Sequence, residues 1–499
     1  MKNIIFTILA LFSLCQTSSA YDNLLIKKKD GKVVMHDIRK VVDVTFEDIN
    51  ETTVMDISYT GFDFKILTDS TVELSKFKFY CEDKKVIVPV KVRIDGKIYD
   101  VTSIGTGAFC ECNVKDIDIY AKLTNIGDMA FSYCFNLTDI KIPSSVKKIG
   151  KGAFDGCYSL KSVEIPYGVD TISDAAFVGS GLKSVKIPSS VKCIGEKAFS
   201  QCPLDSVVEI PEGVITIGAS AFEDCDFLKE IKFPSSVTTL GEKAFFGCNY
   251  LTNVEIPSTL ISIGSGAFSG LTALSEFKVA SDNPNYSSDS TGLYNKDKTE
   301  LLSVKGKIEG KFIIPSSVTS IGNYAFSGCG FLTSIVIPET VTSIGNYAFE
   351  NCNKIISIEV PSTVKTIGNG VFNKCTNLEK VVLNEGLPYI SDRMFYGCKK
   401  LESIGIPSTA ARIGDYSFYG CEGLTSVIIP LGVSSIGNSA FYNCNGLRNL
   451  TIPSSVTTIG DAAFAWLSNL SIVVENSRNN VKVSSGTFFN CKSVTYTVK

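Results

Sequence analysis

Side chains that could support catalysis are few in this chain of 499 residues. It has one histidine, His36, so a histidine general base or an imidazole-activated nucleophile would have to use that residue. His36 stands between Met35 and Asp37 in an alternating apolar and polar run, without a Ser or Cys motif beside it. We therefore interpret it as a solvated strand residue. Because G-x-S-x-G, H-E-x-x-H and phosphate-binding glycine motifs are also missing, the sequence predicts no catalytic residue and no enzyme activity.

Cysteine is the next residue type with possible chemistry, since thiols form disulfides and bind zinc. Side chains that recur at one phase of a repeat project in parallel, which is poor geometry for a disulfide and cannot surround a tetrahedral metal ion. We therefore expect buried free thiols, and we keep Cys81, Cys110 and Cys193, which lie off this series, as the candidates for bridging. The series consists of Cys112, Cys134, Cys157, Cys202, Cys225, Cys248, Cys329, Cys352, Cys375, Cys398, Cys421, Cys444 and Cys491.

Carboxylates and amides could hold calcium near residue 285. Asp282, Asn283 and Asp289 offer oxygens there, but they lack the spaced ligand set of a calcium loop. The other acidic residues are scattered over slots that we expect to be exposed, whereas a glycosidase needs two carboxyls across one cleft. The sequence therefore predicts neither a metal nor a cofactor.

These residues are embedded in a strong internal repeat. Phenylalanine recurs with a step of 23 residues, give or take one, except for a single step of 58 residues between Phe268 and Phe326. A period of this length is typical of a solenoid, in which each repeat buries its apolar face against its neighbours. The repeated residues are Phe109, Phe131, Phe154, Phe177, Phe199, Phe222, Phe245, Phe268, Phe326, Phe349, Phe372, Phe395, Phe418, Phe441, Phe464 and Phe488.

The repeat unit reads I-P-x-x-V-x-x-I-G-x-x-A-F-x-x-C-x-x-L-x-x-V-x. Its V-x-I end alternates with period two, and Pro follows at once, which predicts a strand of three or four residues in one parallel sheet. We expect the Gly after the central Ile to adopt positive φ. No segment keeps a helical period, so we expect turns or single helical turns opposite the strand. Two copies depart from the pattern, since Asp205 replaces the strand-opening Leu and the copy after Phe177 is one residue short.

This pattern resembles the repeat of BspA-type bacterial surface proteins, a branch of the leucine-rich repeat superfamily, from Val101 to about Val498. The resemblance implies a curved right-handed solenoid, with a parallel β-sheet and turns or short helical turns on its convex side. It also implies export to the cell surface or beyond, no catalysis, and adhesion to proteins such as fibronectin and fibrinogen. It assigns a role to no individual residue.

The N-terminus predicts export. Lys2, an apolar run from Ile4 to Leu14 and small residues ending at Ala20 form the pattern of a secretory signal peptide cleaved after Ala20. A lipid anchor at Cys15 is the alternative. The apolar run is too short for a membrane span, and no other segment approaches one. With a net charge of −3 and interspersed signs, the chain has no basic surface for nucleic acid.

Three parts follow from these patterns: the signal peptide 1–20, a β-rich cap or small domain 21–100, and a solenoid 101–499 of about 16 repeats. In the N-terminal part we expect a hairpin turning at Asp30-Gly31, a second turn at Asp95-Gly96 and further strands at 41–46, 62–67, 77–80 and 86–94. The long step contains a hairpin insertion near 280–312, which is either a binding element or a tolerated surface insertion.

The positions of the repeat that we expect to be exposed, called slots below, are the ones that could contact a ligand. The outward strand slot alternates in charge from Asp118 to Lys278, and past the insertion it becomes more apolar at Val336, Val382 and Ile428. Two further slots beside the Phe carry tyrosines, which either anchor a ligand or brace the outer turns. They are Tyr396, Tyr419 and Tyr442 directly after the Phe, and Tyr324, Tyr347 and Tyr416 two residues before it.

We therefore predict an extracellular binding protein, with an adhesin for matrix or surface proteins as the leading interpretation. A glycan-binding or structural envelope scaffold protein is the alternative. The partner is expected on the apolar second half of the solenoid.

Overall fold

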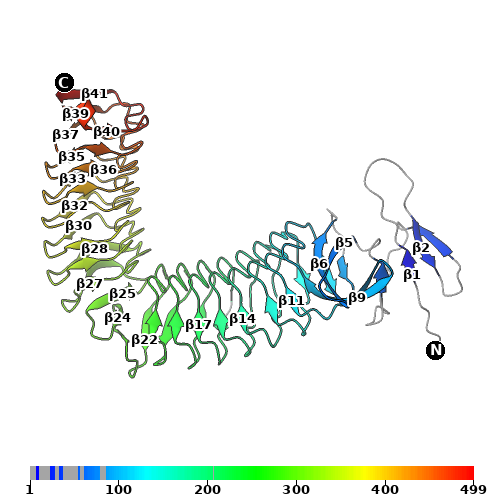
Figure 1. The fold of residues 1–499 in the computed structure, drawn as a ribbon. Coiled ribbons are helices and arrows are strands. Elements are labelled where there is room, and N and C mark those ends of the chain that lie inside the picture. Colours follow the sequence, from blue (N-terminus) through cyan, green and yellow to red (C-terminus); the bar gives the residue numbers. More distant parts are fainter. Residues whose placement is uncertain are drawn as a thin grey trace. The chain divides into compact units, whose positions relative to one another are not determined.

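The computed structural model describes residues 7–9, 23–27, 33–37, 54–56, 61–78, 86–205 and 207–498. It forms two compact units, Met1–Val191 and Lys192–Lys499, and each is a stack of coils in which one coil is one repeat (Figure 1). Within these residues the only helical element is the short 3-10 turn η3 (Arg478–Asn480). None of the described helical structure is long and apolar enough to cross a membrane. The predicted repeat solenoid without regular helices is confirmed.

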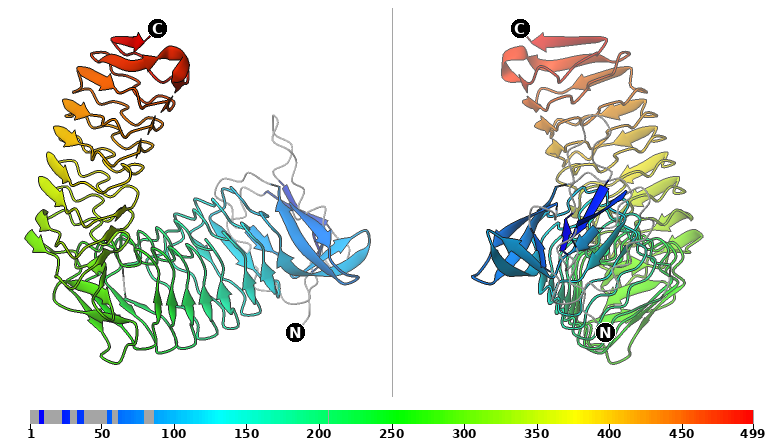
Figure 2. Two further views of the ribbon diagram at one scale, coloured as in Figure 1. Left: turned by 60° about the vertical axis from the view of Figure 1, so that its left-hand side comes forward. Right: turned by 90° about the vertical axis from the view of Figure 1, so that its right-hand side faces the viewer.

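Each coil contributes to two ribbons of parallel strands. The V-x-I segments form a long-strand ribbon, as Ile358 opposite Val381 illustrates, and the residues before the repeated Gly form a short-strand ribbon, as Ile413 opposite Ile436 illustrates. Figure 2 shows the arrows of the long-strand ribbon of unit 2 stacked along one side of the coils. The sequence predicted the first ribbon but not the second, because strands of two residues are too short to show an alternating pattern.

In unit 1 the long-strand ribbon contains β7 (Val86–Val88), β10 (Asp116–Ile119) and β12 (Asp139–Ile140). The short-strand ribbon contains the end of β9 (Lys97–Ile104), β11 (Asn125–Ile126), β13 (Lys148–Ile149) and β14 (Thr171–Ile172).

In unit 2 the long-strand ribbon contains β16 (Val207–Glu209), β18 (Glu230–Lys232), β20 (Asn253–Ile256), β22 (Glu276–Val279), β26 (Gly310–Ile313), β28 (Leu332–Val336), β30 (Ser357–Val360), β32 (Lys380–Leu383), β33 (Ser403–Gly405), β35 (Ser426–Ile428), β37 (Asn449–Ile452), β39 (Ser471–Ser477) and β41 (Ser493–Val498). The short-strand ribbon contains β15 (Cys193–Ile194), β17 (Thr216–Ile217), β19 (Thr239–Leu240), β21 (Ser262–Ile263), β25 (Glu300–Val304), β27 (Ser320–Ile321), β29 (Ser343–Ile344), β31 (Thr366–Ile367), β34 (Arg412–Ile413), β36 (Ser435–Ile436), β38 (Thr458–Ile459) and β40 (Lys482–Val483).

The repeated phenylalanines form the core of each unit. Phe418 is fully buried, and its ring stacks on Phe395 at 5.3 Å and on Phe441 at 5.0 Å between ring centroids. Where the pattern departs from the repeat, a neighbour fills the core: Leu204 is fully buried beside Asp205. Packing is thus set by the period, and single departures are absorbed locally.

The repeated glycine after the central Ile does not have the positive φ that the sequence predicted. In Gly437, for example, φ lies outside the left-handed region. A Cβ on Gly437 would instead lie 2.4 Å from the carboxylate Oδ1 of Asp415 and 2.6 Å from its backbone nitrogen. Glycine is therefore needed because the backbones of successive coils touch at this point, a requirement that only the stacked structure reveals.

Positive φ occurs instead at two other slots of the coil, two residues before and two residues after the Phe. Most of these positions carry residues other than glycine, including Lys243 (55°), Arg393 (54°) and Asn443 (60°). The left-handed turns on each side of the Phe are therefore imposed by the coil, whichever residue is present.

The described N-terminal residues continue the stack. Phe77, at the end of β6 (Thr71–Phe77), stacks on Phe109 at 5.3 Å, and its amide donates to the carbonyl of Ala108. β5 (Phe62–Ile66) pairs antiparallel with β6 and covers this coil with Phe62, whose ring centroid lies 6.0 Å from that of Phe109.

Several expectations for this part are confirmed and others are corrected. β2 (Asn23–Lys27) and β3 (Val33–Asp37) pair antiparallel, as the arms of the predicted hairpin should, and β1 (Thr7–Leu9) pairs with β2. The predicted turn at Asp30-Gly31 lies outside the described residues. The turn at Asp95-Gly96 joins β8 (Lys91–Ile94) to β9, and β4 (Val54–Asp56) pairs with β8.

The predicted single strand 86–94 is wrong, because Pro89, which lacks an amide donor, separates β7 from β8. Of the predicted strand 77–80, Phe77 ends β6 and Lys78 lies outside any strand, while 79–80 lie outside the described residues. The expected strand at 41–46 also lies outside them.

The long step between Phe268 and Phe326 contains an additional coil. The amide of Val304 donates to the carbonyl of Ala325, as the amide of Phe326 does to Ala348, so Val304 occupies a Phe position. β25 and β26 supply the two strands of this coil. The inserted element is therefore the hairpin of β23 (Tyr286–Ser288) and β24 (Gly292–Asn295), which pairs with β25.

Candidate binding surfaces

The cysteine series forms a ladder of hydrogen-bonded thiols. The Cys157 thiol donates to the carbonyl of Phe131 at 3.1 Å, and the Cys398 thiol donates to that of Phe372 at the same distance. Burial raises the pKa of the Cys157 thiol to about 12. Among the described cysteines, Cys110 is a free thiol. The series itself is buried as predicted, except at Cys112 and Cys491, which are half-buried. These thiols are structural groups without nucleophilic character. Cys15 and Cys81 lie outside the described residues.

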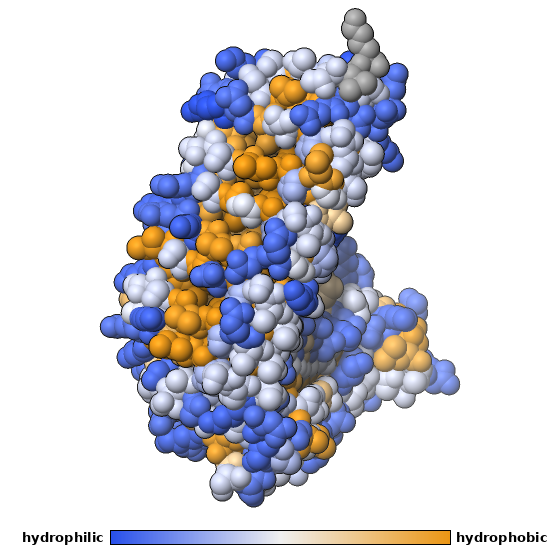
Figure 3. Space-filling view, turned by 90° about the vertical axis from the view of Figure 1, so that its left-hand side faces the viewer, coloured by the Kyte–Doolittle hydropathy of each residue, from blue (hydrophilic) through white to orange (hydrophobic). Residues whose placement is uncertain are grey.

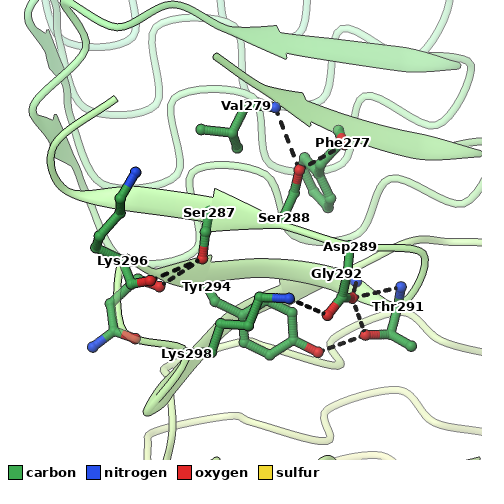
Figure 4. Close-up of polar contacts among 11 residues, drawn as sticks. Phe277, Val279, Ser287, Ser288, Asp289, Thr291, Gly292, Tyr294, Lys296 and Lys298 are labelled. Carbon is green, nitrogen blue, oxygen red and sulfur yellow. Dashed lines mark hydrogen bonds and ion pairs between the residues drawn. The ribbon is translucent and has the colours of Figure 1, made fainter. Parts of the chain in front are cut away.

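The oxygens considered for calcium are engaged in separate networks. Asn283 is fully buried, and its amide nitrogen donates to the carbonyls of Pro257 and Leu260. Asp289 accepts hydrogen bonds from Thr291 and pairs with Lys298 at 2.8 Å (Figure 4). Burial would raise the pKa of Asp289, but the hydrogen bonds from Lys298 and Thr291 outweigh it and lower this pKa. These contacts hold the hairpin in place.

Opposite charges at the outward strand slot form ion pairs between neighbouring strands of the ribbon. Lys232 lies 3.6 Å from Glu209, and Lys278 lies 3.5 Å from Glu255. All four side chains are more than half exposed, so each pair contributes little to stability. These two pairs place opposite charges side by side on this face.

Past the insertion the same slot becomes more apolar on the long-strand ribbon, where Val336, Val382 and Ile428 alternate with Glu359, Gly405 and Thr451. Ile428 is 78% exposed, Val336 is 40% exposed and Val382 is half-buried. Figure 3 shows a hydrophobic band along this face of unit 2. Exposed apolar side chains that gather on one face often mark a binding site.

This slot also contains apolar residues that sequence reasoning missed. Ile313, which is 62% exposed, pairs with Val336, and Val473 pairs with Thr451 farther along the ribbon. Ile313 was missed because its coil has Val304 in place of Phe. The Ile314-Pro315 dipeptide after it was the available signal. We use "apolar column" below for Ile313, Val336, Val382, Ile428 and Val473.

The tyrosines directly after the Phe form a continuous stack. Tyr396, Tyr419 and Tyr442 lie 4.8 Å apart between successive ring centroids, with interplanar angles of 4° and 1°. All three are half-buried. Tyr416 contacts this stack through Tyr419, at 6.0 Å. The middle ring, Tyr419, therefore has both faces covered by neighbouring tyrosines, which leaves only its edge and hydroxyl for a ligand.

The tyrosines two residues before the Phe are also half-buried and engaged. Tyr324 stacks on Tyr347 at 5.3 Å and lies under the ammonium of Lys243 at 4.5 Å, while Arg393 lies over Tyr416. Their positive φ values carry no functional signal, because other residues at this slot share them. All six tyrosines belong to turns beside the Phe and not to the strands of the apolar column, so the predicted site residues fall into two separate groups.

His36 lies in β3 of the N-terminal sheet, opposite Leu24. This position fits the predicted strand.

Known proteins match most of the chain. A family model described as "BspA type Leucine rich repeat region (6 copies)" matches residues 92–205, 193–290, 305–422 and 388–499. A search of curated proteins gave no match.

Two solved structures show the same kind of fold. A leucine rich cell surface protein from Faecalibacterium prausnitzii is 28% identical, with 85% of this chain and 97% of that chain covered and a TM-score of 0.51. A leucine-rich repeat protein from Eubacterium ventriosum is 23% identical, with 79% and 89% covered and a TM-score of 0.53.

Proposed function

We propose, since this chain belongs to the BspA-type leucine-rich repeat family, that it is an exported, non-catalytic binding protein that holds a protein ligand on unit 2. The exposed apolar column carries this proposal. Its side chains stand on a rigid ladder of strands, so a partner meets a preformed surface and little entropy is lost on ordering it. The surface suits an adhesin for a matrix or surface protein.

Export is supported by the signal-like N-terminus and by the related structure that is named a cell surface protein. Residues 61–78 fit the role of an end cap, because they place Phe62 and Phe77 over the first Phe of the repeat and so shield the open end of the core.

A comparison of matched variants tests the proposed surface. Immobilised matrix proteins and a glycan array would first be screened with the mature chain. The triple variant Ile313→Ser, Val336→Ser and Ile428→Ser should then weaken protein binding at least tenfold while the thermal unfolding midpoint stays unchanged.

Two further variants serve as controls. Val207→Ser with Ile261→Ser removes exposed apolar side chains of unit 2 outside the column and should leave binding intact. The triple variant Tyr396→Ala, Tyr419→Ala and Tyr442→Ala tests the tyrosine hypothesis, and loss of binding in it alone would place the ligand on the turns instead. Unchanged binding in the column variant would refute the proposed surface, and binding to glycans alone would favour the glycan-binding alternative.

A further inference from the structure

A small cavity lies in unit 2 where the hairpin interrupts the stack of coils. Its volume is about 220 Å³. One wall is the coil segment 263–268, and the opposite walls come from Tyr286 and Leu293 of the hairpin and from Glu300 and Leu302 of β25. This site is distinct from the apolar column.

The hydrogen-bond ladder of the turns is broken at this cavity. In the preceding coil, the amide of Lys243 donates to the carbonyl of Ser265 at 3.0 Å and that of Phe245 donates to Ala267 at 2.9 Å. The corresponding amides in the next coil belong to Gly266 and Phe268. Neither has a hydrogen-bond acceptor among the described residues, and both residues line the cavity.

Other backbone groups of this coil are satisfied by side chains of the insertion. The Asn285 amide donates to the carbonyl of Ile261 at 2.7 Å, and the Tyr286 hydroxyl accepts from the Ile263 amide at 2.8 Å. The Ser303 hydroxyl donates to the carbonyl of Phe268 at 3.1 Å. Side chains of the insertion and of β25 therefore replace part of the hydrogen-bond ladder, whereas the amides of Gly266 and Phe268, two residues that line the cavity, have no acceptor among the described residues. Buried amides are almost always paired, so an acceptor-bearing ligand would be stabilised here.

The charge of the lining residues limits the chemical class of ligand that the cavity can bind. Glu300 is the only acidic or basic residue among those that line the cavity. Its carboxylate disfavours a simple anion, and a simple cation would leave the two amides unused. Neutral hydroxyl groups can both accept from the amides of Gly266 and Phe268 and donate to Glu300.

The walls supply the remaining features of a sugar site. The ring of Tyr286 and the side chains of Leu293 and Leu302 offer apolar surface to the C–H face of a ring. The volume is below the range of about 300–1,000 Å³ that is usual for larger ligands, so it suits a single ring.

We propose that this cavity binds one neutral sugar residue, held by the amides of Gly266 and Phe268 and by the carboxylate of Glu300. The proposal goes beyond the function assigned to the apolar column and does not depend on it.

Isothermal titration calorimetry of the mature chain with a panel of neutral hexoses and their methyl glycosides tests this site. We expect saturable binding with a dissociation constant in the millimolar range for at least one sugar. Glu300→Gln should weaken that binding at least tenfold. Leu302→Trp, which fills the cavity, should abolish it. The control Glu339→Gln, on an exposed turn of the same unit, should leave it unchanged.

Thermal unfolding of each variant shows whether it is folded, and Glu300→Gln remains informative if Leu302→Trp unfolds. Equal binding of a hexose and its methyl glycoside indicates the end of a glycan, and binding of the free hexose alone indicates a free sugar. The proposal is overturned by the lack of saturable binding, by binding that survives in folded Glu300→Gln protein, or by binding of zwitterionic amino acids in place of sugars.

Discussion

A position can require glycine because a Cβ would clash or because the backbone has a positive φ. Three glycines in neighbouring coils of unit 2 allow these two reasons to be tested separately. Gly437 has no room for a Cβ but an ordinary φ, Gly420 has room but a φ of +71°, and Gly405 has both room and an ordinary φ. Gly437→Ala therefore tests the close approach of the coils, and Gly420→Ala tests the backbone conformation. Gly405→Ala is the control in which neither effect is present.

The expected cost at Gly437 follows from the contacts. Its Cβ would lie 2.4 Å from Asp415 Oδ1, so the coils must separate by roughly 1 Å to reach ordinary van der Waals contact. The separation weakens two hydrogen bonds, from the amides of Gly437 to Ile413 at 2.8 Å and of Asn438 to Asp415 at 2.7 Å. Overpacking costs about 1–3 kcal/mol and each hydrogen bond about 1 kcal/mol, while the stiffer unfolded chain returns about 0.4–1 kcal/mol. We expect a net destabilisation of about 2–4 kcal/mol.

The other two glycines give smaller effects. Gly420→Ala keeps 3.9 Å to Gly397 Cα and suffers only the left-handed backbone, at about 1 kcal/mol. Gly405→Ala, with no atom within 4 Å, should be stabilising by about 0.4–1 kcal/mol.

Urea unfolding of the mature chain, followed by circular dichroism, measures these differences. The order Gly405, Gly420, Gly437 from most to least stable variant supports the reasoning. A larger loss in Gly420→Ala than in Gly437→Ala would refute it, because backbone conformation and not coil contact would then be the reason for the repeated glycine.

The other perturbations address the core, the thiols and the surface charges. Phe418→Ala removes a fully buried ring and should cost about 3–5 kcal/mol in urea unfolding, and a loss under 1 kcal/mol would contradict a continuous Phe core. The thiol of Cys157 ionises near pH 9.0 when unfolded and near 12 when folded, so its stabilising contribution is complete below pH 9 and falls as the pH rises toward 12. Cys157→Ala should accordingly reduce the loss of urea stability between pH 8 and pH 10, and an equal loss in both proteins would be evidence against a buried thiol. Lys232→Ala, which removes the exposed pair with Glu209, should change stability by about 1 kcal/mol or less, and a larger change measured at 0.15 M salt would show that the ladder contributes more than its exposure implies.

The sequence predicted the solenoid and its core because period and burial have one cause. Every coil must bury Phe, Val, Ile and Cys against the same positions of the next coil, so a feature such as Cys398 recurs with the period and can be counted. The charged pair of Lys278 and Glu255 was predictable for the same reason, since strand ladders place equivalent residues side by side.

The misses have physical reasons. Val304 was not recognised as a core position because a coil can close with a smaller side chain once the hairpin fills part of the space. The role of Gly437 was misjudged because a sequence shows that glycine is required, but shows neither φ nor the distance to the next backbone. The stacking of Tyr396, Tyr419 and Tyr442 on one another also depends on side-chain directions that spacing does not specify.

The sequence by itself determined the features that recur with the repeat. They are the coil, the ladder of buried side chains and the alternating charge at the outward strand slot. Only the tertiary structure decided what happens where the repeat stops, because broken hydrogen-bond ladders involve backbone amides that every residue has. The amides of Gly266 and Phe268, which have no acceptor among the described residues, carry no signature in residue type. They lie where the hairpin interrupts the hydrogen-bond ladder of the turns.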